Sequence, residues 1–259
     1  MHILIDIGNS TIVVAIADHE GNITNHWRFK TRKEETVSFF RYELKQGLRK
    51  YGVELTDVES VTISSVVPEV DDDVAQAIND LTGIDPHFFC IDDAKGLITI
   101  DIESPSQLGK DRLADALGAV ACHGAPAIVI DFGTATTFGV IDADGAFLGG
   151  TICPGIKLSS EALVTGTAKL PRFELAKPEN VIGRTTLSNL QSGMYYGYVG
   201  LVRNIVRKIR QELGVDAYVV ATGGMALMIA DESKVIDKLD GLLTLKGLRL
   251  IYERNRTDN

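Results

Sequence analysis

The sequence predicts an α/β protein built from two related halves, residues 1–115 and 116–259. Each half opens with strands and continues with helices, the order expected when helices pack onto a sheet. The opening pattern of the first half is a strand, an Asp-x-Gly turn, a strand, an acidic turn with glycine and a third strand, and it returns at the start of the second half. With 259 residues, 45% of them hydrophobic, the chain is long enough to build two cores.

The first half begins with three short apolar runs, at 3–5, 11–17 and 23–29. Tight turns separate them, so they are predicted to form antiparallel strands. Further along, the pattern predicts an amphipathic stretch, a strand ended by proline, a helix, a short strand and a second helix, at 34–51, 60–67, 71–81, 87–91 and 112–121.

The second half repeats the three opening strands at 127–130, 136–141 and 146–152. A helical run at 159–165, a loop with prolines at 169–178 and a long amphipathic helix at 186–213 come next. The chain is then expected to form a strand at 217–221 that ends in Thr-Gly-Gly, a helix from Met225, and a last apolar strand at 248–252.

The amino-acid composition indicates which kinds of partner and which compartment are expected for this chain. The formal net charge is −9, from 26 Lys and Arg against 35 Asp and Glu, which argues against a nucleic-acid surface. Three widely spaced cysteines are expected to be buried free thiols in a reducing compartment. Neither a signal peptide nor an apolar run of membrane-spanning length is present, so a cytoplasmic protein that does not bind membranes is expected.

The first acid-glycine turn is a candidate phosphate-binding loop. A buried strand brings the Asp6 carboxylate to its end, and Gly8 lets the backbone turn close to a ligand. Asn9, Ser10 and Thr11 add side-chain donors, and the carboxylate can hold a hydrated Mg²⁺ that bridges phosphate oxygens. One such turn in isolation is more often an ordinary hairpin.

A second turn of the same kind makes a phosphate clamp the better interpretation. Asp131, Phe132 and Gly133 are followed by three threonines within the next four residues. Gly223 and Gly224 follow a strand and precede a helix, which allows close approach of a flat ligand, although a Gly-Gly pair alone is commonly a helix entry turn. Two Asp-x-Gly loops facing each other would hold a nucleotide from two sides.

Six segments in order along the chain closely resemble type III pantothenate kinase. They are D-x-G-N-S at 6–10, G-K-D-R at 109–112, D-F-G-T-A-T-T at 131–137, G-G-T-I-C-P-G at 149–155, T-T-L-S-N-L-Q-S-G at 185–193 and A-T-G-G at 221–224. The resemblance implies two homologous ribonuclease-H-like half-domains of the actin/hexokinase/Hsp70 (ASKHA) type with an interdomain nucleotide cleft. It also implies ATP-dependent phosphorylation of pantothenate to 4′-phosphopantothenate, the first step of coenzyme A biosynthesis.

The resemblance also implies roles for single residues. Asp111 would be the base that activates the pantothenate hydroxyl, and Arg112 offers a planar fork for the substrate carboxylate. Asp131 would hold the monovalent cation, K⁺ or NH₄⁺, and Asp6 would hold Mg²⁺ through water. The remaining pantothenate contacts would be Gly109, Lys110 and Thr186. The remaining ATP contacts would be Ile7, Gly8, Asn9, Ser10, Thr11, Ile12, Val13, Thr134, Gly223 and Gly224. A homodimer is expected.

Several alternatives stay open at this point. Asp111 stands at the start of a predicted helix, so it could be only an N-cap. The acceptor could be another small molecule such as a sugar, acetate or polyphosphate, or the chain could be a non-catalytic actin-like nucleotide-binding module. Ile102 stands where family members often have an aromatic residue. The five histidines show no ligand spacing and are expected at the surface or satisfied in the core.

Overall fold

The computed structural model describes residues 1–257, with side chains described as far as Arg254. Internal contacts divide the chain into two compact units. The first unit contains Met1–Thr99, Glu103–Ala121 and the described residues from Leu243, and the second contains Ile100–Ile102 and Cys122–Leu242. The sequence-based boundary after residue 115 placed 116–121 and the segment from Leu243 in the second half, whereas their contacts lie in the first unit.

The first unit is built on a five-stranded sheet with the order β3-β2-β1-β4-β5. Its strands are β1 (His2–Ile7), β2 (Thr11–Ala17), β3 (Ile23–Lys30), β4 (Ser60–Ser65) and β5 (His87–Phe88). β1 pairs antiparallel with β2 and parallel with β4, with Asp6 opposite Val13 and Ser64. The three antiparallel strands predicted from the tight turns are confirmed.

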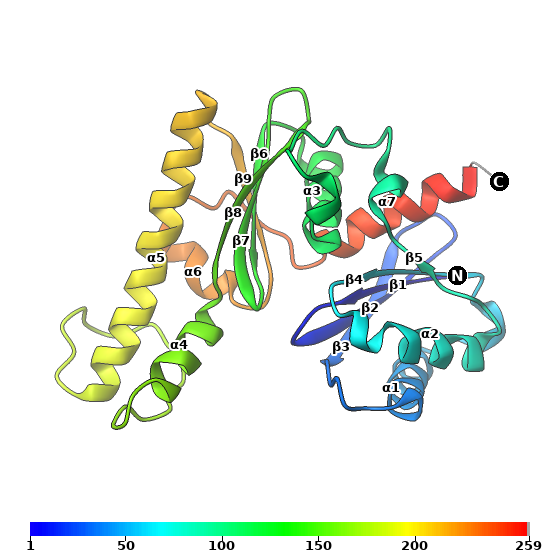
Figure 1. The fold of residues 1–259 in the computed structure, drawn as a ribbon, viewed down its shortest axis with the longest axis horizontal. Helices are drawn as coiled ribbons and strands as arrows, with labels where there is room; N and C mark the ends of the chain where they lie inside the picture. Colours follow the sequence, from blue (N-terminus) through cyan, green and yellow to red (C-terminus); the bar gives the residue numbers. More distant parts are fainter. Residues whose placement is uncertain (258–259) are drawn as a thin grey trace. The chain divides into compact units, whose positions relative to one another are not determined.

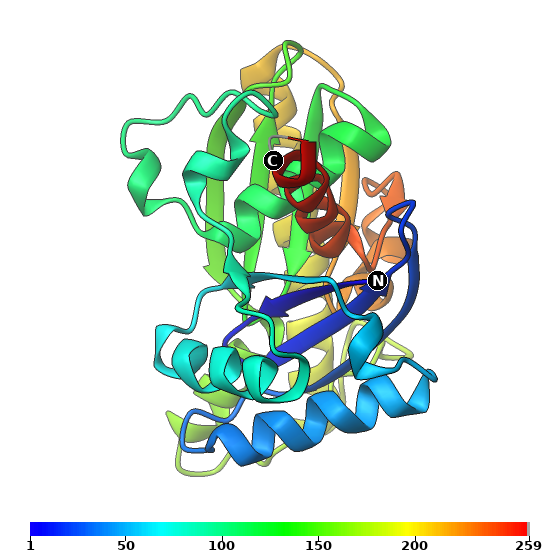
Figure 2. The ribbon, with the colours of Figure 1, turned by 90° about the vertical axis from the view of Figure 1, so that its right-hand side faces the viewer.

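Helices cover both faces of this sheet. α1 (Val37–Lys50) and α2 (Pro68–Thr82) lie side by side on one face, and α7 (Leu243–Thr257) lies against β1 and β4 on the other (Figures 1 and 2). Phe40, Leu44 and Leu48 of α1 are buried in one core with the apolar side chains of β1, β2 and β4. α3 (Lys110–His123) completes the helices of this unit through Ala121.

The strand predicted at 248–252 is wrong, because this segment is part of α7. Leu245, Leu248 and Ile251 are buried at steps of three residues, the spacing of one helix face. The apolar run alone did not distinguish a strand from a buried helix. The helical register also brings Gly247 against α3.

The second unit repeats the sheet with the order β10-β9-β6-β7-β8. Its strands are β6 (Ala127–Phe132), β7 (Ala135–Ile141), β8 (Phe147–Pro154), β9 (Tyr218–Thr222) and β10 (Lys238–Leu239). β6 pairs antiparallel with β7 and parallel with β9, as β1 does with β2 and β4. The repeat predicted from the two Asp-x-Gly turns is therefore a repeat of sheet topology.

Helices α5 (Thr186–Leu213) and α6 (Ala226–Ser233) form a core with β6, β7 and β9 in the second unit (Figure 1). α4 (Ile156–Thr165) packs against α5. α5 begins with a capping box between Thr185 and Ser188 and ends at Gly214, which adopts the left-handed conformation. Across residues 1–257, no helix combines the length and hydropathy needed to cross a membrane.

The close crossing of α7 and α3 gives a test of this fold. A Cβ atom added to Gly247 would lie 1.8 Å from the carbonyl oxygen of Ala114, which is too close for any side chain. We expect Gly247→Ala to lower the free energy of unfolding by about 1–3 kcal/mol, the usual cost of overpacking. Urea denaturation followed by circular dichroism measures it.

Gly193→Ala in α5 is the matched control, because no heavy atom other than the nearby backbone of its own helix lies within 4 Å of its added Cβ. This substitution should raise stability by up to ~1 kcal/mol, since alanine is the better helix former. Equal stability of the two variants would contradict the docking of α7 on α3.

Candidate active site

The first acid-glycine turn joins β1 to β2. Asp6 is the second-last residue of β1, and the N–H of Gly8 donates to the carbonyl oxygen of Thr11 at 3.1 Å, which closes the turn. The hydroxyl of Thr31 donates to the carbonyl oxygen of Gly8 at 2.6 Å. Asn9 and Ser10 are exposed at the tip. The structure thus holds Asp6 at a strand end, beside exposed polar side chains.

A serine on the neighbouring strand shares the face of Asp6. The parallel register pairs Asp6 with Ser64 of β4, so both side chains leave the sheet on the same side. Ser64 is fully buried, and its hydroxyl has no hydrogen-bond partner within the described chain. Carboxylate and hydroxyl oxygens can bind Mg²⁺ directly or accept hydrogen bonds from its bound water, so the residues present fit this cation. Ser64 was not predicted from the sequence, because its place beside Asp6 depends on the crossover register.

The second turn repeats this arrangement in the other unit. Asp131 is the second-last residue of β6 and pairs with Thr137 of β7 and Thr222 of β9. Thr134 is exposed in the turn, and its carbonyl oxygen accepts a hydrogen bond from the N–H of Gly155 at 3.0 Å. The threonine hydroxyls and the carboxylate form an oxygen-rich strand end, which fits a hard monovalent cation.

Gly223 makes room for the Asp131 carboxylate. Its φ of +89° is a conformation that side-chain-bearing residues rarely adopt, and an added Cβ would lie 2.5 Å from Oδ1 of Asp131. The same atom would lie 2.6 Å from backbone atoms of Phe132. Glycine is therefore required here for the β9–α6 turn to pack against the second acid-glycine turn. Gly224 follows it, exposed, at the entry to α6.

Asp111 lies in the first turn of α3, one residue inside the start of the helix at Lys110. Its Oδ1 accepts a hydrogen bond from the backbone N–H of Arg112 at 2.7 Å. A Cβ on Gly109 would lie 2.5 Å from the same oxygen, so this glycine also leaves space for a carboxylate. Burial raises the pKa of Asp111, while the N–H and the charge of Arg112 oppose the rise. A carboxylate with a raised pKa is the form that general bases take.

Thr186 is the first residue of α5 and is exposed beside its capping residue, Thr185. Gly109, Lys110, Asp111 and Arg112 belong to the first unit with the Asp6 turn. Asp131, Thr134, Thr186, Gly223 and Gly224 belong to the second unit. Within the second unit the structure brings together Asp131 and Gly223, and within the first it brings together Gly109 and Asp111.

A cavity of about 430 Å³ lies beside the Gly-Gly turn in the second unit. Met225, the residue after Gly224, lines it together with Met228 of α6. Ile156 of α4 and Phe173 of the following loop add to its apolar wall. Two cations and two carboxylates also line it, namely Lys157, Arg172, Glu161 and Glu174. An apolar wall with a few polar groups around it suits the base of a nucleotide.

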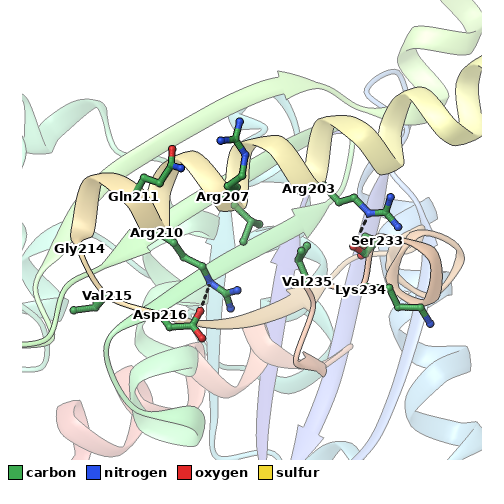
Figure 3. A pocket seen from close by; sticks show the side chains of 11 residues that line it. Arg203, Arg207, Arg210, Gln211, Gly214, Val215, Asp216, Ser233, Lys234 and Val235 are labelled. Atoms are coloured by element: carbon green, nitrogen blue, oxygen red, sulfur yellow. Dashed lines mark hydrogen bonds and ion pairs between the residues drawn. The ribbon is translucent and has the colours of Figure 1, made fainter.

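A second cavity, of about 760 Å³, lies between the end of α5 and the residues after α6 (Figure 3). Arg203 and Arg210 line it, but their guanidinium groups are engaged in the fold. Arg203 donates to the carbonyl oxygen of Ser233, and Arg210 pairs with Asp216 (Figure 3). Arg210 also donates to the carbonyl oxygen of Ala217. None of the residues expected to bind ATP or pantothenate lines this cavity.

Comparison with known proteins assigns the chain to a protein family. The family model described as type III pantothenate kinase matches residues 2–208. The chain belongs to the type III pantothenate kinase family. It is therefore a member of a family of kinases, which are nucleotide-binding phosphotransferases.

Solved structures agree on the fold. A protein from Campylobacter jejuni described as a Baf family transcriptional activator is 18% identical, with a TM-score of 0.61 over 98% of this chain and 99% of that one. The activator of 2-hydroxyisocaproyl-CoA dehydratase from Clostridium difficile, with bound ADPNP, is 12% identical, with a TM-score of 0.55 over 99% and 96%. Ethanolamine utilization protein EutJ from Carboxydothermus hydrogenoformans is 15% identical, with a TM-score of 0.54 over 96% and 89%. The predicted actin/hexokinase-like fold class is confirmed.

The raised pKa of Asp111 gives a prediction that separates a base from a capping residue. The pKa of Asp111 is higher in the folded protein than in the unfolded chain. The carboxyl group of Asp111 therefore contributes its full stability below the unfolded-state pKa, and this contribution is lost as the pH rises through the folded-state pKa. The Asp111→Asn variant should therefore melt at or above the wild-type temperature at pH 7, and this difference should shrink on acidification. Differential scanning fluorimetry from pH 4 to pH 8 measures it. A capping role predicts the opposite sign, a loss of about 1 kcal/mol at pH 7.

Proposed function

We propose that this chain transfers the γ-phosphoryl group of ATP to the hydroxyl group of pantothenate. The products are ADP and 4′-phosphopantothenate, in the first step of coenzyme A biosynthesis. The observation that carries the proposal is the Asp111 carboxylate, which is held at the start of α3 beside Gly109 and Arg112 with a raised pKa. The family match over residues 2–208 supports the choice of substrate.

In the proposed reaction the hydroxyl oxygen of pantothenate attacks the γ-phosphorus. The bond from that phosphorus to the β,γ-bridging oxygen breaks, ADP leaves, and the hydroxyl proton passes to the carboxylate of Asp111. Arg112 pairs with the carboxylate of pantothenate, because a guanidinium presents two parallel donors to such a group. Gly109, Lys110 and Thr186 are proposed as further contacts with this substrate. Most of the acceleration then comes from positioning and charge neutralisation.

The nucleotide is proposed to bind through residues of both acid-glycine turns. Asp6 to Val13 and Thr134 are the proposed phosphate contacts, and Gly223 and Gly224 lie at the proposed nucleoside site. The cavity beside Met225 and Met228 supports that assignment, since its size and apolar wall suit a purine ring.

Two cations complete the proposal. Asp6 would hold Mg²⁺ through water, and Asp131 would hold K⁺ or NH₄⁺. Bound cations would neutralise the phosphate charge that builds up during transfer. The oxygen donors at the two strand ends support these assignments, because both cations prefer oxygen ligands.

A cytoplasmic homodimer is also part of the proposal. Val181 and Ile182, just before α5, are exposed at 62% and 82% of their surface, which is unusual for neighbouring apolar residues. An apolar surface of this kind suits contact with a second copy of the chain.

The decisive experiment is a coupled ADP-release assay with Mg²⁺ and K⁺, with and without pantothenate. ADP release should depend on pantothenate, and Asp111→Asn should lower kcat by 100-fold or more, in the upper range for loss of a general base, while ATP still binds. Asp92→Asn, an exposed carboxylate in the same unit, is the control and should keep wild-type turnover. Turnover with a sugar or acetate in place of pantothenate would identify another acceptor, and wild-type turnover in Asp111→Asn would rule out its role as base.

The cation assignment is tested in the same assay with K⁺ replaced by Na⁺. We expect lower turnover in Na⁺, because the larger ion is the one proposed to match the oxygen set near Asp131. Asp131→Asn should lower turnover in K⁺ and remove most of the difference between the two ions. Asp144→Asn, an exposed carboxylate of the same unit, should keep that difference. Equal rates of the wild type in K⁺ and Na⁺ would exclude a specific monovalent site.

A further inference from the structure

Two histidines and a glutamate meet at one end of the first sheet, although they come from three separate segments. The register pairs His2 of β1 with Ala17 of β2, so His19, two residues after Ala17, lies beside the start of β1. It also pairs His2 with Ser60 of β4, so Glu59 lies next to it. The parallel strands β1 and β4 both begin here, whereas Asp6 stands at the opposite end of β1.

The ligand atoms of this His2-His19-Glu59 cluster are already near metal-binding spacing. Nε2 of His2 lies 3.8 Å and Nδ1 of His19 lies 3.5 Å from Oε2 of Glu59, and all three atoms lie within 4.8 Å of one another. Tetrahedral bonds of about 2.0–2.1 Å would place neighbouring ligand atoms about 3.3 Å apart. Only small movements are needed, and His19, with 65% of its side chain exposed, is able to make them.

The surroundings orient these groups. Nδ1 of His2 lies 2.9 Å from the hydroxyl of Ser60, so a ring N–H donated there would leave the lone pair on Nε2, where the Tyr252 hydroxyl now lies at 2.6 Å. The carboxylate of Asp18 accepts hydrogen bonds from the N–H groups of Glu20 and Asn22, which hold the turn that carries His19. The other oxygen of Glu59 lies 3.7 Å from the amino group of Met1, which leaves Oε2 for the imidazoles.

From this geometry we propose that the His2-His19-Glu59 cluster binds one divalent transition-metal ion, with Zn²⁺ as the best fit. Two imidazole nitrogens and one carboxylate oxygen suit Zn²⁺, Ni²⁺ or Cu²⁺, whereas Mg²⁺ requires oxygen ligands. The ion joins the start of β1, the turn after β2 and the residue before β4. Binding therefore stabilises the first unit and is separate from the reaction at Asp111.

One group competes with the metal. The hydroxyl of Tyr252 in α7 lies 2.6 Å from Nε2 of His2, the atom that the ion needs. The ion has to displace this hydrogen bond, so Tyr252→Phe is expected to bind the metal several-fold more tightly than the wild type. An equal or weaker affinity in this variant would overturn the assignment of Nε2 as a ligand.

The test uses the full chain without a polyhistidine tag. Titration with Co²⁺ should produce visible d–d absorption bands with a stoichiometry of one, and added Zn²⁺ should abolish them. Zn²⁺ should also raise the melting temperature by mass action. The Mg²⁺ comparison uses the Asp6→Asn variant, which lacks the residue proposed to hold Mg²⁺. In this variant the same concentration of Mg²⁺ should not raise the melting temperature as Zn²⁺ does.

Variants locate the site. His19→Ala and Glu59→Gln should each weaken Zn²⁺ binding at least tenfold, and both side chains are exposed enough for the fold to tolerate the change. His87→Ala is the matched control, because His87 also pairs with a carboxylate, Asp93, but lies outside the cluster. Binding in His19→Ala equal to that of the wild type, or equal loss in His87→Ala, would overturn the proposal. ADP release by His19→Ala should match that of the wild type. The metal titrations need no turnover, so their outcome does not depend on the proposed kinase activity.

Discussion

The candidate chemistry depends on two carboxylates, those of Asp131 and Asp111, and each of them has room only because the residue beside it is a glycine. Gly223 lies so close to Asp131, and Gly109 so close to Asp111, that a single added carbon would come within 2.5 Å of a carboxylate oxygen in each case. Backbone turns rather than packed side chains therefore set the position of these acids. This arrangement keeps each carboxylate accessible at the end of an element whose other side chains form a rigid core.

Much of this arrangement follows from local sequence patterns. Alternating apolar runs on either side of Asp6 and Asp131 predict the two hairpins, because tight turns leave antiparallel pairing as the simple connection. The start of α5 at Thr186 follows from periodicity and its capping residue, whereas α3 begins at Lys110, two residues before the predicted start.

Features that depend on long-range register were not predictable in this way. The pairing of Asp6 with Ser64 requires the crossover between β1 and β4, and the contact of Gly223 with Asp131 requires the parallel pairing of β6 and β9. The cluster of His2 and His19 arises for the same reason, since spacing along the chain carries no sign of it. The helix α7 was missed because a short apolar run has no unique period.

The return of α7 to the first sheet makes that unit discontinuous. Its helix buries Leu245, Leu248 and Ile251, and it lies against β1 and β4, which are made near the beginning of the chain. During synthesis, the hairpin of β1 and β2 emerges long before the segment that covers the other face of its sheet. The second unit, by contrast, is nearly continuous in sequence from Cys122. The nascent first unit therefore keeps an uncovered apolar face until translation has passed Leu243, which exposes it to chaperones and to aggregation for most of its time on the ribosome.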